Sequence, residues 1–409
     1  MIIKRRDILL EKFLCLKIIY IERESQKMFN NFVWETTKNG EPGFFNTINN
    51  CFLSYESSKE EFRKNFFYED QIEECLIKKL ENRNEEYANF TIILGWECNL
   101  RCKHCVVLKK LKMPQQDRTQ IDLLKLKKFI KNYEKHMHYK GSKLCFVGGE
   151  PLLYLDQIFE LHKLTDSNAE YFATTNLTIP LTDEDIDKIR IFKSITVSID
   201  GNEEAHNGQR IPLYETESVF SDIIENIKKL IKAGLVDLIR VQAALTDENA
   251  SKEKILDLYE ILLSLGIKSK KIKIGCVHPT ITKPNPEQSF LNVLAKGEIC
   301  TKPCCKYRAE SLLIDKEKIF SDFYDYVEIG SINDSPEEIV KKRIEKCFIH
   351  MPVLKDENCK KCPVLGYCWG GCSNGSVLTK ENPSKFCGQK NLIEKSKLKS
   401  IDGSLVDLK

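Results

Sequence analysis

From residue 90 onward, short apolar segments alternate with amphipathic ones, and this pattern constrains the fold more than any other feature. Six segments have the length and apolar content of strands buried on both faces: 90–96, 143–150, 171–176, 193–200, 238–245 and 271–277. Three segments between them carry apolar residues at helical spacing: 123–135, 216–234 and 252–266. Strands joined by helical crossovers form a parallel sheet. We therefore expect an α/β fold, a partial (β/α)6 barrel similar to a TIM barrel; a doubly wound sheet is the alternative.

The regular alternation covers only the middle of the chain, which predicts three parts. A length of 409 residues corresponds to two or three domains at about 150 residues each. We expect residues 1–88 to form a small α+β segment, with two strand-like runs around a turn at Asn39-Gly40 and Pro42-Gly43. Two short helices are expected to follow, over residues 57–67 and 71–81. We interpret the segment as a peptide-recognition or cap unit. Residues 89–285 form the barrel. Residues 286–409 are rich in cysteine and lack the alternation.

Composition and charge exclude several classes of protein. The net charge of +3 lacks the basic excess of a general nucleic-acid binder. The sequence has no apolar run of about 18 residues, so we expect no membrane-spanning helix. The apolar N-terminal stretch is interrupted by Glu11, Lys12 and Lys17 and is followed by no small-residue cleavage site, which argues against a signal peptide. We therefore expect a cytoplasmic protein.

Cysteine is the most informative residue type in this chain. The 17 cysteines are an odd number, and nine of them lie between Cys300 and Cys387. In a chain without an export signal, clustered cysteines are metal ligands or catalytic thiols more often than disulfides.

The first cysteine cluster follows directly after the first barrel strand. Cys98, Cys102 and Cys105 have the spacing C-x3-C-x2-C. Three thiolates on one loop suit three irons of a 4Fe–4S cluster, with the fourth iron left open for another ligand. Zinc with His104 nearby is one alternative, and unligated thiols are another.

Polar residues and glycines follow three further strands. Gly148-Gly149-Glu150-Pro151 ends the second strand, where glycines permit close backbone approach and Glu150 can accept a hydrogen bond from an amine. Asn176 ends the third strand. Ser198 and Asp200 end the fourth and point the same way, which suits a ribose. Such residues are also common turn formers, but parallel strands bring all of these ends to one edge of the sheet.

The loop CNLRCKHC and the GGEP segment resemble the radical S-adenosylmethionine enzymes, over about residues 90–280. The resemblance implies that Cys98, Cys102 and Cys105 bind a 4Fe–4S cluster whose open iron is chelated by S-adenosylmethionine. In that family, an electron from the cluster cleaves the cofactor, and the resulting 5′-deoxyadenosyl radical abstracts a substrate hydrogen. The residues implied to bind the cofactor are Gly148, Gly149 and Glu150 at its amine, Ser198 and Asp200 at its ribose, Asn176 nearby, and Arg210 at its carboxylate. His104 departs from the family, which usually has an aromatic residue there.

The second cysteine cluster resembles the SPASM extension of these enzymes, which carries auxiliary iron–sulfur clusters. Cys359, Cys362, Cys368 and Cys372 have the spacing C-x2-C-x5-C-x3-C, and Cys387 follows. A zinc ribbon would need two C-x2-C pairs, and this run has one. The resemblance implies one auxiliary cluster on Cys359, Cys362, Cys368 and Cys387. It implies a nearer one on Cys372, with Cys300, Cys304 and Cys305 as further candidates.

The nearer auxiliary cluster is where the chain departs from this pattern. The family has an ID-x-x-G turn followed by a cysteine, whereas this chain has Ile314-Asp315 and then Asp322 at about the cysteine position. We therefore expect either one or two auxiliary clusters, with Cys347 as a substitute ligand.

The resemblance implies an oxidoreductase that modifies a peptide or protein side chain in the maturation of ribosomally made peptides, through a thioether or other crosslink. Its partners would be that substrate and an electron donor such as flavodoxin or ferredoxin. The first alternative is an anaerobic sulfatase-type formylglycine maturase, and small-molecule dehydrogenation is a further one. A non-catalytic iron–sulfur electron-transfer protein is the alternative from another class, but it does not explain GGEP together with six strand–helix units.

Overall fold

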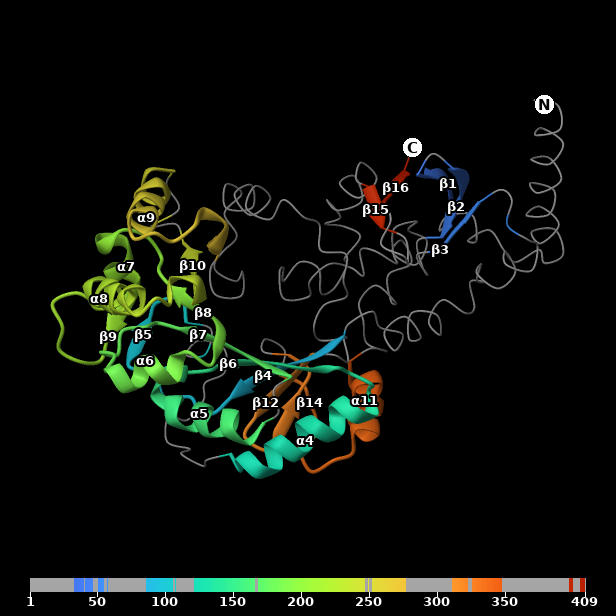
Figure 1. Ribbon diagram of the computed structural model, residues 1–409, viewed down its shortest axis with the longest axis horizontal. Coiled ribbons are helices and arrows are strands. Elements are labelled where there is room, and N and C mark those ends of the chain that lie inside the picture. The colour runs from blue at the N-terminus through green and yellow to red at the C-terminus, as the bar shows by residue number, and fades with distance from the viewer. Residues whose placement is uncertain are drawn as a thin grey trace. The chain divides into compact units, whose positions relative to one another are not determined.

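The computed structural model describes these residues: 33–39, 41–46, 51–54, 57, 86–105, 107, 121–165, 168–246, 249, 252–276, 311–322, 326–347, 397–399 and 405–408. The chain forms two compact units (Figure 1). The larger unit comprises residues 85–297 and 309–347, and the smaller comprises 1–84, 298–308 and 348–409.

A nine-stranded sheet, in the order β11-β10-β8-β7-β6-β4-β12-β13-β14, forms the centre of the larger unit. The six strands expected from the sequence are its parallel part: β4 (Tyr87–Ile93), β6 (Gly141–Val147), β7 (Ala169–Thr175), β8 (Phe192–Ser198), β10 (Ile239–Leu245) and β11 (Ile272–Cys276). Each pairs in parallel with its neighbour. Their carboxyl ends therefore meet at one edge of the sheet.

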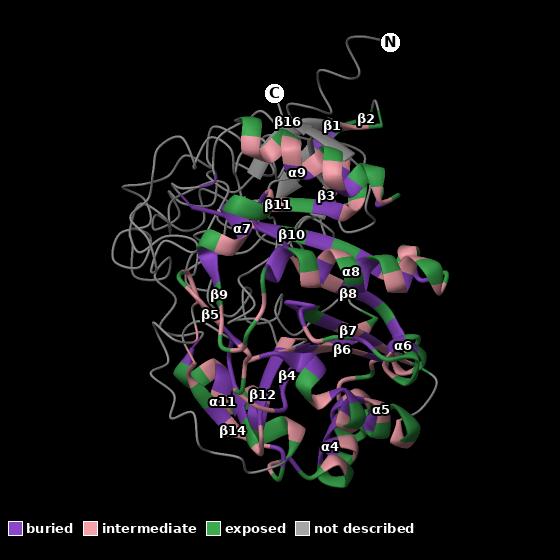
Figure 2. Ribbon diagram, turned by 90° about the vertical axis from the view of Figure 1, so that its left-hand side faces the viewer, coloured by how far each residue is buried: buried purple, intermediate pink, exposed green. Residues whose placement is uncertain are grey.

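Helices connect these strands, and α4, α5, α6 and α8 lie on the same side of them (Figure 2). Their bounds are α4 Leu123–His136, α5 Leu155–Leu164, α6 Asp183–Ile189, α7 Glu203–Gln209, α8 Val219–Lys232 and α9 Lys252–Ser264. Short 3-10 turns are η4 Pro151–Tyr154, η5 Val236–Leu238 and η6 Ser269–Lys271. A doubly wound sheet has helices on both faces, so this arrangement is consistent with a partial TIM barrel.

The helix α8 shows how the sequence determines these boundaries. The Ser218 side chain accepts a hydrogen bond from the backbone amide of Ser221 and caps the helix at its start. Ile223 and Ile227 are fully buried on the face toward the sheet. The helix ends before Gly234, whose φ of 77° suits a residue without a Cβ.

Aromatic side chains fill the layer between the sheet and the helices. Phe90 of β4 lies edge-on to Phe129 and Tyr133 of α4, with ring centroids 6.2 and 5.8 Å apart. Phe146 of β6 stacks on Tyr171 of β7 at 5.9 Å. Alternate residues of a strand point to opposite faces, so the residues between these aromatics face away from the helices.

Three strands from residues 311–331 extend the sheet beyond β4. The strand β12 (Ser311–Asp315) pairs in parallel with β4, and β13 (Lys318–Phe320) and β14 (Glu328–Ser331) follow it antiparallel. The helix α11 (Pro336–Lys346) comes next. Residues 286–409 lack the strand–helix alternation in the sequence, which predicts a separate cysteine-rich part. The chain instead returns to the sheet there, and this segment belongs to the larger unit.

The smaller unit contains a five-stranded sheet in the order β15-β16-β1-β2-β3. Its strands are β1 Val33–Lys38, β2 Glu41–Asn46, β3 Cys51–Ser54, β15 Lys397–Lys399 and β16 Leu405–Leu408. The predicted hairpin at Asn39-Gly40 is confirmed: β1 and β2 are antiparallel, and Asn39 has a φ of 51°. The turn expected at Pro42-Gly43 was wrong, because both residues lie in β2 and pair with Thr37 and Thr36. The antiparallel pairing of β1 with β16 joins the two ends of the chain in one sheet.

The expected helical runs at 57–67 and 71–81 lie outside the described residues, apart from residue 57. Among the helices described above, none combines the length and the apolar character needed to cross a membrane.

Candidate functional site

The cysteine loop begins directly after β4 at the carboxyl edge of the sheet. Cys98, Cys102 and Cys105 are all half-buried there. The Cys98 sulfur accepts from the backbone amide of Leu100 at 3.4 Å and from the Asn176 side chain at 3.8 Å. The Cys105 amide donates to the Cys102 carbonyl at 3.1 Å, which closes the loop around the second sulfur.

Burial controls the ionisation of these thiols. It raises the pKa of Cys98 to about 12. It also raises the pKa of Cys102, against the opposing effect of the nearby Arg210 guanidinium. A thiol with a raised pKa is protonated at neutral pH, so metal binding here would displace protons. Among the described residues, no three His, Cys, Asp or Glu side chains are placed to bind one metal ion.

A short antiparallel ladder ties this loop to a distant part of the chain. The strand β5 (Leu100–Cys102) pairs with β9 (Arg210–Pro212), so that Cys102 lies opposite Arg210. Two backbone hydrogen bonds continue the ladder, from Lys103 to the Gln209 carbonyl and from Leu213 to the Asn99 carbonyl, both 2.9 Å. No sequence signal marks this ladder, because each strand has only three residues.

The GGEP segment packs directly against the chain that leads into the cysteine loop. The Gly149 amide donates to the Gly95 carbonyl at 3.2 Å, and the Glu150 amide donates to the Glu97 carbonyl at 2.8 Å. A Cβ on Gly149 would lie 2.0 Å from the Glu97 oxygen. Gly148 has a φ of 124°, which also favours glycine. The two glycines thus permit close contact between backbones.

Glu150 is 2% exposed and joins the ends of β6 and β7. Its carboxylate accepts from the Thr175 hydroxyl, from the Asn176 amide at 2.7 Å and from the Leu152 amide at 3.0 Å. Burial raises its pKa, and these hydrogen bonds oppose the rise. The sequence predicts that Glu150 accepts a hydrogen bond from the cofactor amine; in the structure its carboxylate also holds two strand ends together.

Asn176 connects β7 to the cysteine loop. Its side-chain amide donates to the Asn99 side chain at 2.9 Å as well as to the Cys98 sulfur. Its oxygen accepts from the Thr178 amide at 3.0 Å and from the Thr178 hydroxyl at 2.9 Å. Asn176 therefore orients the loop from the neighbouring strand.

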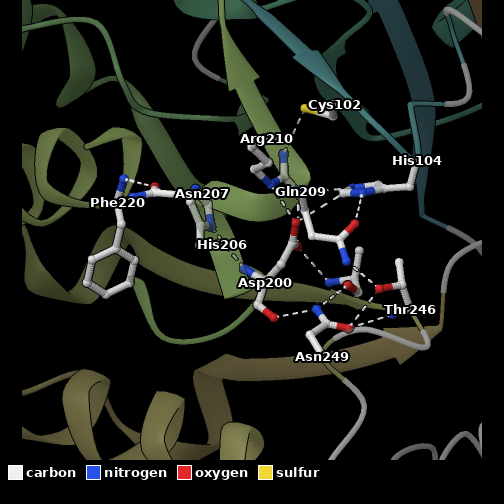
Figure 3. Close-up of polar contacts among 11 residues, drawn as sticks. Cys102, His104, Asp200, His206, Asn207, Gln209, Arg210, Phe220, Thr246 and Asn249 are labelled. Atoms are coloured by element: carbon white, nitrogen blue, oxygen red, sulfur yellow. Dashed lines mark hydrogen bonds and ion pairs between the residues drawn. The ribbon is translucent and has the colours of Figure 1, made fainter. Parts of the chain in front are cut away.

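Asp200 and Arg210 form a buried ion pair beside Cys102 (Figure 3). Arg210 donates from Nε to Oδ2 of Asp200 at 2.7 Å and from Nη2 to Oδ1 at 3.0 Å. Its Nη1 lies 3.8 Å from the Cys102 sulfur. Burial would raise the pKa of Asp200, but the guanidinium outweighs it and holds the pKa below its usual value. The two residues, predicted as separate cofactor contacts, form one unit.

Residues that were not predicted to bind the cofactor complete this network (Figure 3). The His104 ring lies 3.4 Å from the Gln209 side-chain oxygen and 3.5 Å from Nη2 of Arg210. Gln209 in turn donates to the Thr246 hydroxyl, and the Asn249 side chain donates to the Asp200 carbonyl at 2.6 Å. His104 therefore contributes to the polar network beside the loop.

His206 lies behind this network on α7 and is fully buried. Its Nδ1 accepts from the Asp200 backbone amide at 3.2 Å, so the ring proton is on Nε2. Nε2 has no hydrogen-bond partner among the described residues. Burial, with the nearby Arg210 charge, lowers the His206 pKa to about 3, and the ring is neutral.

Ser198 ends β8 and is half-buried. Its hydroxyl makes no hydrogen bond within the described part of the chain. Cys347 is fully buried at the end of α11. Asp322 is 4% exposed just after β13, and its carboxylate accepts from the Ser321 hydroxyl at 3.2 Å. The remaining predicted cluster ligands lie outside the described residues: Cys300, Cys304, Cys305, Cys359, Cys362, Cys368, Cys372 and Cys387.

The added strand β12 also reaches the cysteine loop. Asp315 at its end accepts from Trp96 Nε1 at 3.1 Å and from the Tyr326 hydroxyl. Trp96 lies two residues before Cys98, and its ring is 6.3 Å from that of Tyr326. Residues 311–331 thereby help to position the start of the loop.

One protein-family model matches the part of the chain that holds this site. Residues 92–262 match the model of the Radical SAM superfamily. That segment contains the three cysteines, the GGEP segment and the Asp200–Arg210 pair. This segment is therefore similar to a radical SAM domain. Comparison with curated proteins gave no match.

Solved structures agree in fold. Native anSMEcpe with bound AdoMet is 17% identical with a TM-score of 0.54, over 74% of this chain and 95% of that chain. SuiB of Streptococcus suis bound to precursor peptide SuiA is 13% identical with a TM-score of 0.54, over 88% and 99%. Native anSMEcpe with bound AdoMet and Cp18Cys peptide is 17% identical with a TM-score of 0.54, over 75% and 95%. At these identities the likeness establishes the fold.

Proposed function

We propose that this protein is a radical S-adenosylmethionine enzyme that modifies a side chain of a peptide or protein. The single observation that carries the proposal is the position of the Cys98–Cys105 loop. It lies at the carboxyl edge of a parallel sheet, where folds of this class place their active sites. Asn176 and Arg210 contact its sulfurs from two different strands.

The donor set fits an iron–sulfur cluster. Cysteine thiolates are the usual ligands of 4Fe–4S clusters. Cys98, Cys102 and Cys105 supply three of them from one loop, and the close packing of Gly149 on Glu97 fixes the backbone before that loop. When bound, the cluster and S-adenosylmethionine would supply the one-electron chemistry.

The chain's own residues would bind and orient the cofactor. Gly148 and Gly149 let the backbone approach it closely, and the Ser198 hydroxyl is available for a ribose. Glu150, Asn176, Asp200 and Arg210 are proposed cofactor contacts that also hold the strand ends in place. A carboxylate has about four lone-pair sites, so Glu150 and Asp200 can accept further hydrogen bonds.

The C-terminal cysteines are proposed to form a SPASM module with one or two auxiliary clusters. One cluster would use Cys359, Cys362, Cys368 and Cys387; the nearer one would use Cys372 with Cys300, Cys304 or Cys305. Cys347 belongs to the larger unit.

A peptide substrate is supported by the bound molecules of structures with this fold. SuiB holds its precursor peptide SuiA, and anSMEcpe holds the Cp18Cys peptide. The substrate proposed here is a ribosomally made peptide that receives a thioether or other crosslink, with flavodoxin or ferredoxin as electron donor. The strands β1–β3 are the proposed peptide-recognition unit, through strand addition.

A formylglycine maturase of the anaerobic sulfatase type is the second candidate. That reaction needs a carboxylate near the cluster, and Asp315 provides one at the same sheet edge, bonded to Trp96. The two candidates differ in product, because formylglycine is an aldehyde and reacts with a hydrazide probe, whereas a thioether does not.

The test is 5′-deoxyadenosine formation by anaerobically reconstituted protein with S-adenosylmethionine and a reductant. Protein with Cys98, Cys102 and Cys105 all changed to Ala is the control. We expect product from the parent alone. A parent that is filled with iron but neither binds nor cleaves S-adenosylmethionine would favour a non-catalytic electron-transfer protein. Cys359→Ala and Cys387→Ala should lose peptide turnover and retain part of the cofactor cleavage.

A further inference from the structure

We propose that Arg210 is a positioning residue for the first cluster: it fixes Cys102 and donates a charge-assisted hydrogen bond to its sulfur. This inference rests on the proposed function, because it requires a cluster on Cys98, Cys102 and Cys105. It assigns Arg210 a role toward the cluster, which is distinct from a contact with the cofactor carboxylate.

The backbone pairing between β5 and β9 brings Arg210 to Cys102. Antiparallel pairing of β5 with β9 places Cys102 opposite Arg210. The next residue, Lys103, donates its amide to Gln209 at 2.9 Å. The second cluster ligand is thus built into a ladder with Arg210, whereas Cys98 and Cys105 lie outside that ladder. The pairing therefore links the backbone position of Cys102 to that of Arg210.

The Arg210 side chain also reaches the Cys102 sulfur. The guanidinium Nη1 lies 3.8 Å from the Cys102 sulfur, within hydrogen-bonding reach for sulfur. The other side of the guanidinium is held by both oxygens of Asp200. Asp200 is itself held, since its Oδ1 accepts from the Ala244 amide at 2.9 Å. A planar guanidinium bonded in this way has one orientation, and that orientation faces the sulfur.

The positive charge of Arg210 should affect the reduction potential of the cluster. The Arg210 side chain is 10% exposed, so its charge is weakly screened. A reduced cluster carries one more negative charge than an oxidised one. A nearby buried cation therefore stabilises the reduced form more and raises the reduction potential. Loss of the guanidinium should lower that potential.

Arg101 shows that an arginine next to Cys102 in the sequence need not contact the Cys102 sulfur. Arg101 precedes Cys102 directly, but its Nη1 donates to the carbonyls of Cys98 and Leu100, both at 2.9 Å. Among the described hydrogen bonds, Arg210 is the arginine that reaches a cysteine sulfur.

The experiment measures the midpoint potential of the first cluster in the full-length, anaerobically reconstituted protein, by titration followed with electron paramagnetic resonance. The first cluster is identified as the signal that disappears when Cys98, Cys102 and Cys105 are changed to Ala. The variants are Arg210→Gln, which removes the charge, and Arg210→Lys, which keeps it. Arg240→Gln is the matched control, since Arg240 is exposed on β10. Circular dichroism checks the fold of each.

We expect Arg210→Gln to disfavour one-electron reduction about tenfold, a shift of about 59 mV to lower potential. Arg210→Lys should also lower the potential, but by less than Arg210→Gln, because lysine keeps the positive charge. A shift remains because an ammonium cannot bond both oxygens of Asp200 and also reach the Cys102 sulfur. Arg240→Gln should match the parent. Loss of the first cluster from folded Arg210→Gln protein would also support the proposal.

A parent-like potential in folded Arg210→Gln protein would overturn it, as would an equal shift in Arg240→Gln. If Arg210→Gln does not fold, a parent-like potential in Arg210→Lys would overturn it. A parent that assembles no cluster on the three cysteines contradicts the proposed function instead.

Discussion

Asp200 and Arg210 form a bidentate ion pair at the carboxyl edge of the sheet, with N–O distances of 2.7 and 3.0 Å and exposed side-chain fractions of 0% and 10%. The pair spans the helix α7, from just after β8 to the start of β9. It therefore links the fourth barrel strand to the ladder that holds Cys102.

Removing one member of this pair should destabilise the fold. Asp200→Ala leaves a buried guanidinium without its counter-charge, which costs about 3–5 kcal/mol of the free energy of unfolding. Urea denaturation measures the change. Glu86→Ala is the control, because it breaks the exposed pair with Lys140 and should cost less than about 1 kcal/mol. Equal losses of stability in the two variants would show that the Asp200–Arg210 pair contributes no more than an exposed ion pair.

The buried His206 predicts how stability depends on pH. Its pKa falls from 6.5 to about 3 in the folded protein, so between these values the unfolded chain binds the extra proton. Stability is therefore lost as pH falls below 6.5, by about 1.4 kcal/mol per pH unit, or about 2 kcal/mol at pH 5. His206→Gln should remove this part of the slope between pH 7 and pH 5. An unchanged slope in folded His206→Gln protein would contradict the assignment.

The close packing of Gly149 predicts a difference between two glycine substitutions. A Cβ at Gly149 meets the Glu97 oxygen at 2.0 Å, so Gly149→Ala should cost at least about 1–3 kcal/mol and reduce iron loading. A Cβ at Gly208 meets nothing within 4 Å, and this residue lies in α7. Gly208→Ala should stabilise the protein by up to about 1 kcal/mol. Thermal denaturation and iron content compare the two, and similar behaviour would contradict the packing described here.

The contact between Trp96 and Asp315 predicts an energetic coupling between the cysteine loop and β12. Trp96→Phe removes the indole donor and keeps a ring. In a double-mutant cycle with Asp315→Asn we expect a coupling of about 1–3 kcal/mol. Additive effects of the two substitutions would show that β12 does not stabilise the start of the loop.

The sequence predicted the six parallel strands because strands buried on both faces are continuous apolar runs. Periodicity does not reveal pairing partners between distant segments. The pairing of residues 311–331 with the sheet at β4 could therefore not be predicted. The three-residue strands around Cys102 and Arg210 were too short to detect in the sequence.

The sequence predicted where the cysteine loop lies, and only partly how the side chains around it are arranged. The spacing of Cys98, Cys102 and Cys105 placed them on one loop at a strand end, and the structure has them there. Glu150 and Asp200 were predicted as contacts to a ligand, whereas the structure also bonds them to Thr175, Asn176 and Arg210. Those partners come from other strands. Gln209 and Asn249 carry no motif, so no sequence signal marked them.

The most direct test of the account is the electron paramagnetic resonance spectrum of the reduced protein, recorded with and without S-adenosylmethionine. We expect the cofactor to change the spectrum of the parent, because it would bind an open iron of the cluster on Cys98, Cys102 and Cys105. The variant with these three cysteines changed to Ala should show no such change. A parent spectrum that is insensitive to S-adenosylmethionine, or a change that persists in the triple variant, would contradict the central claim.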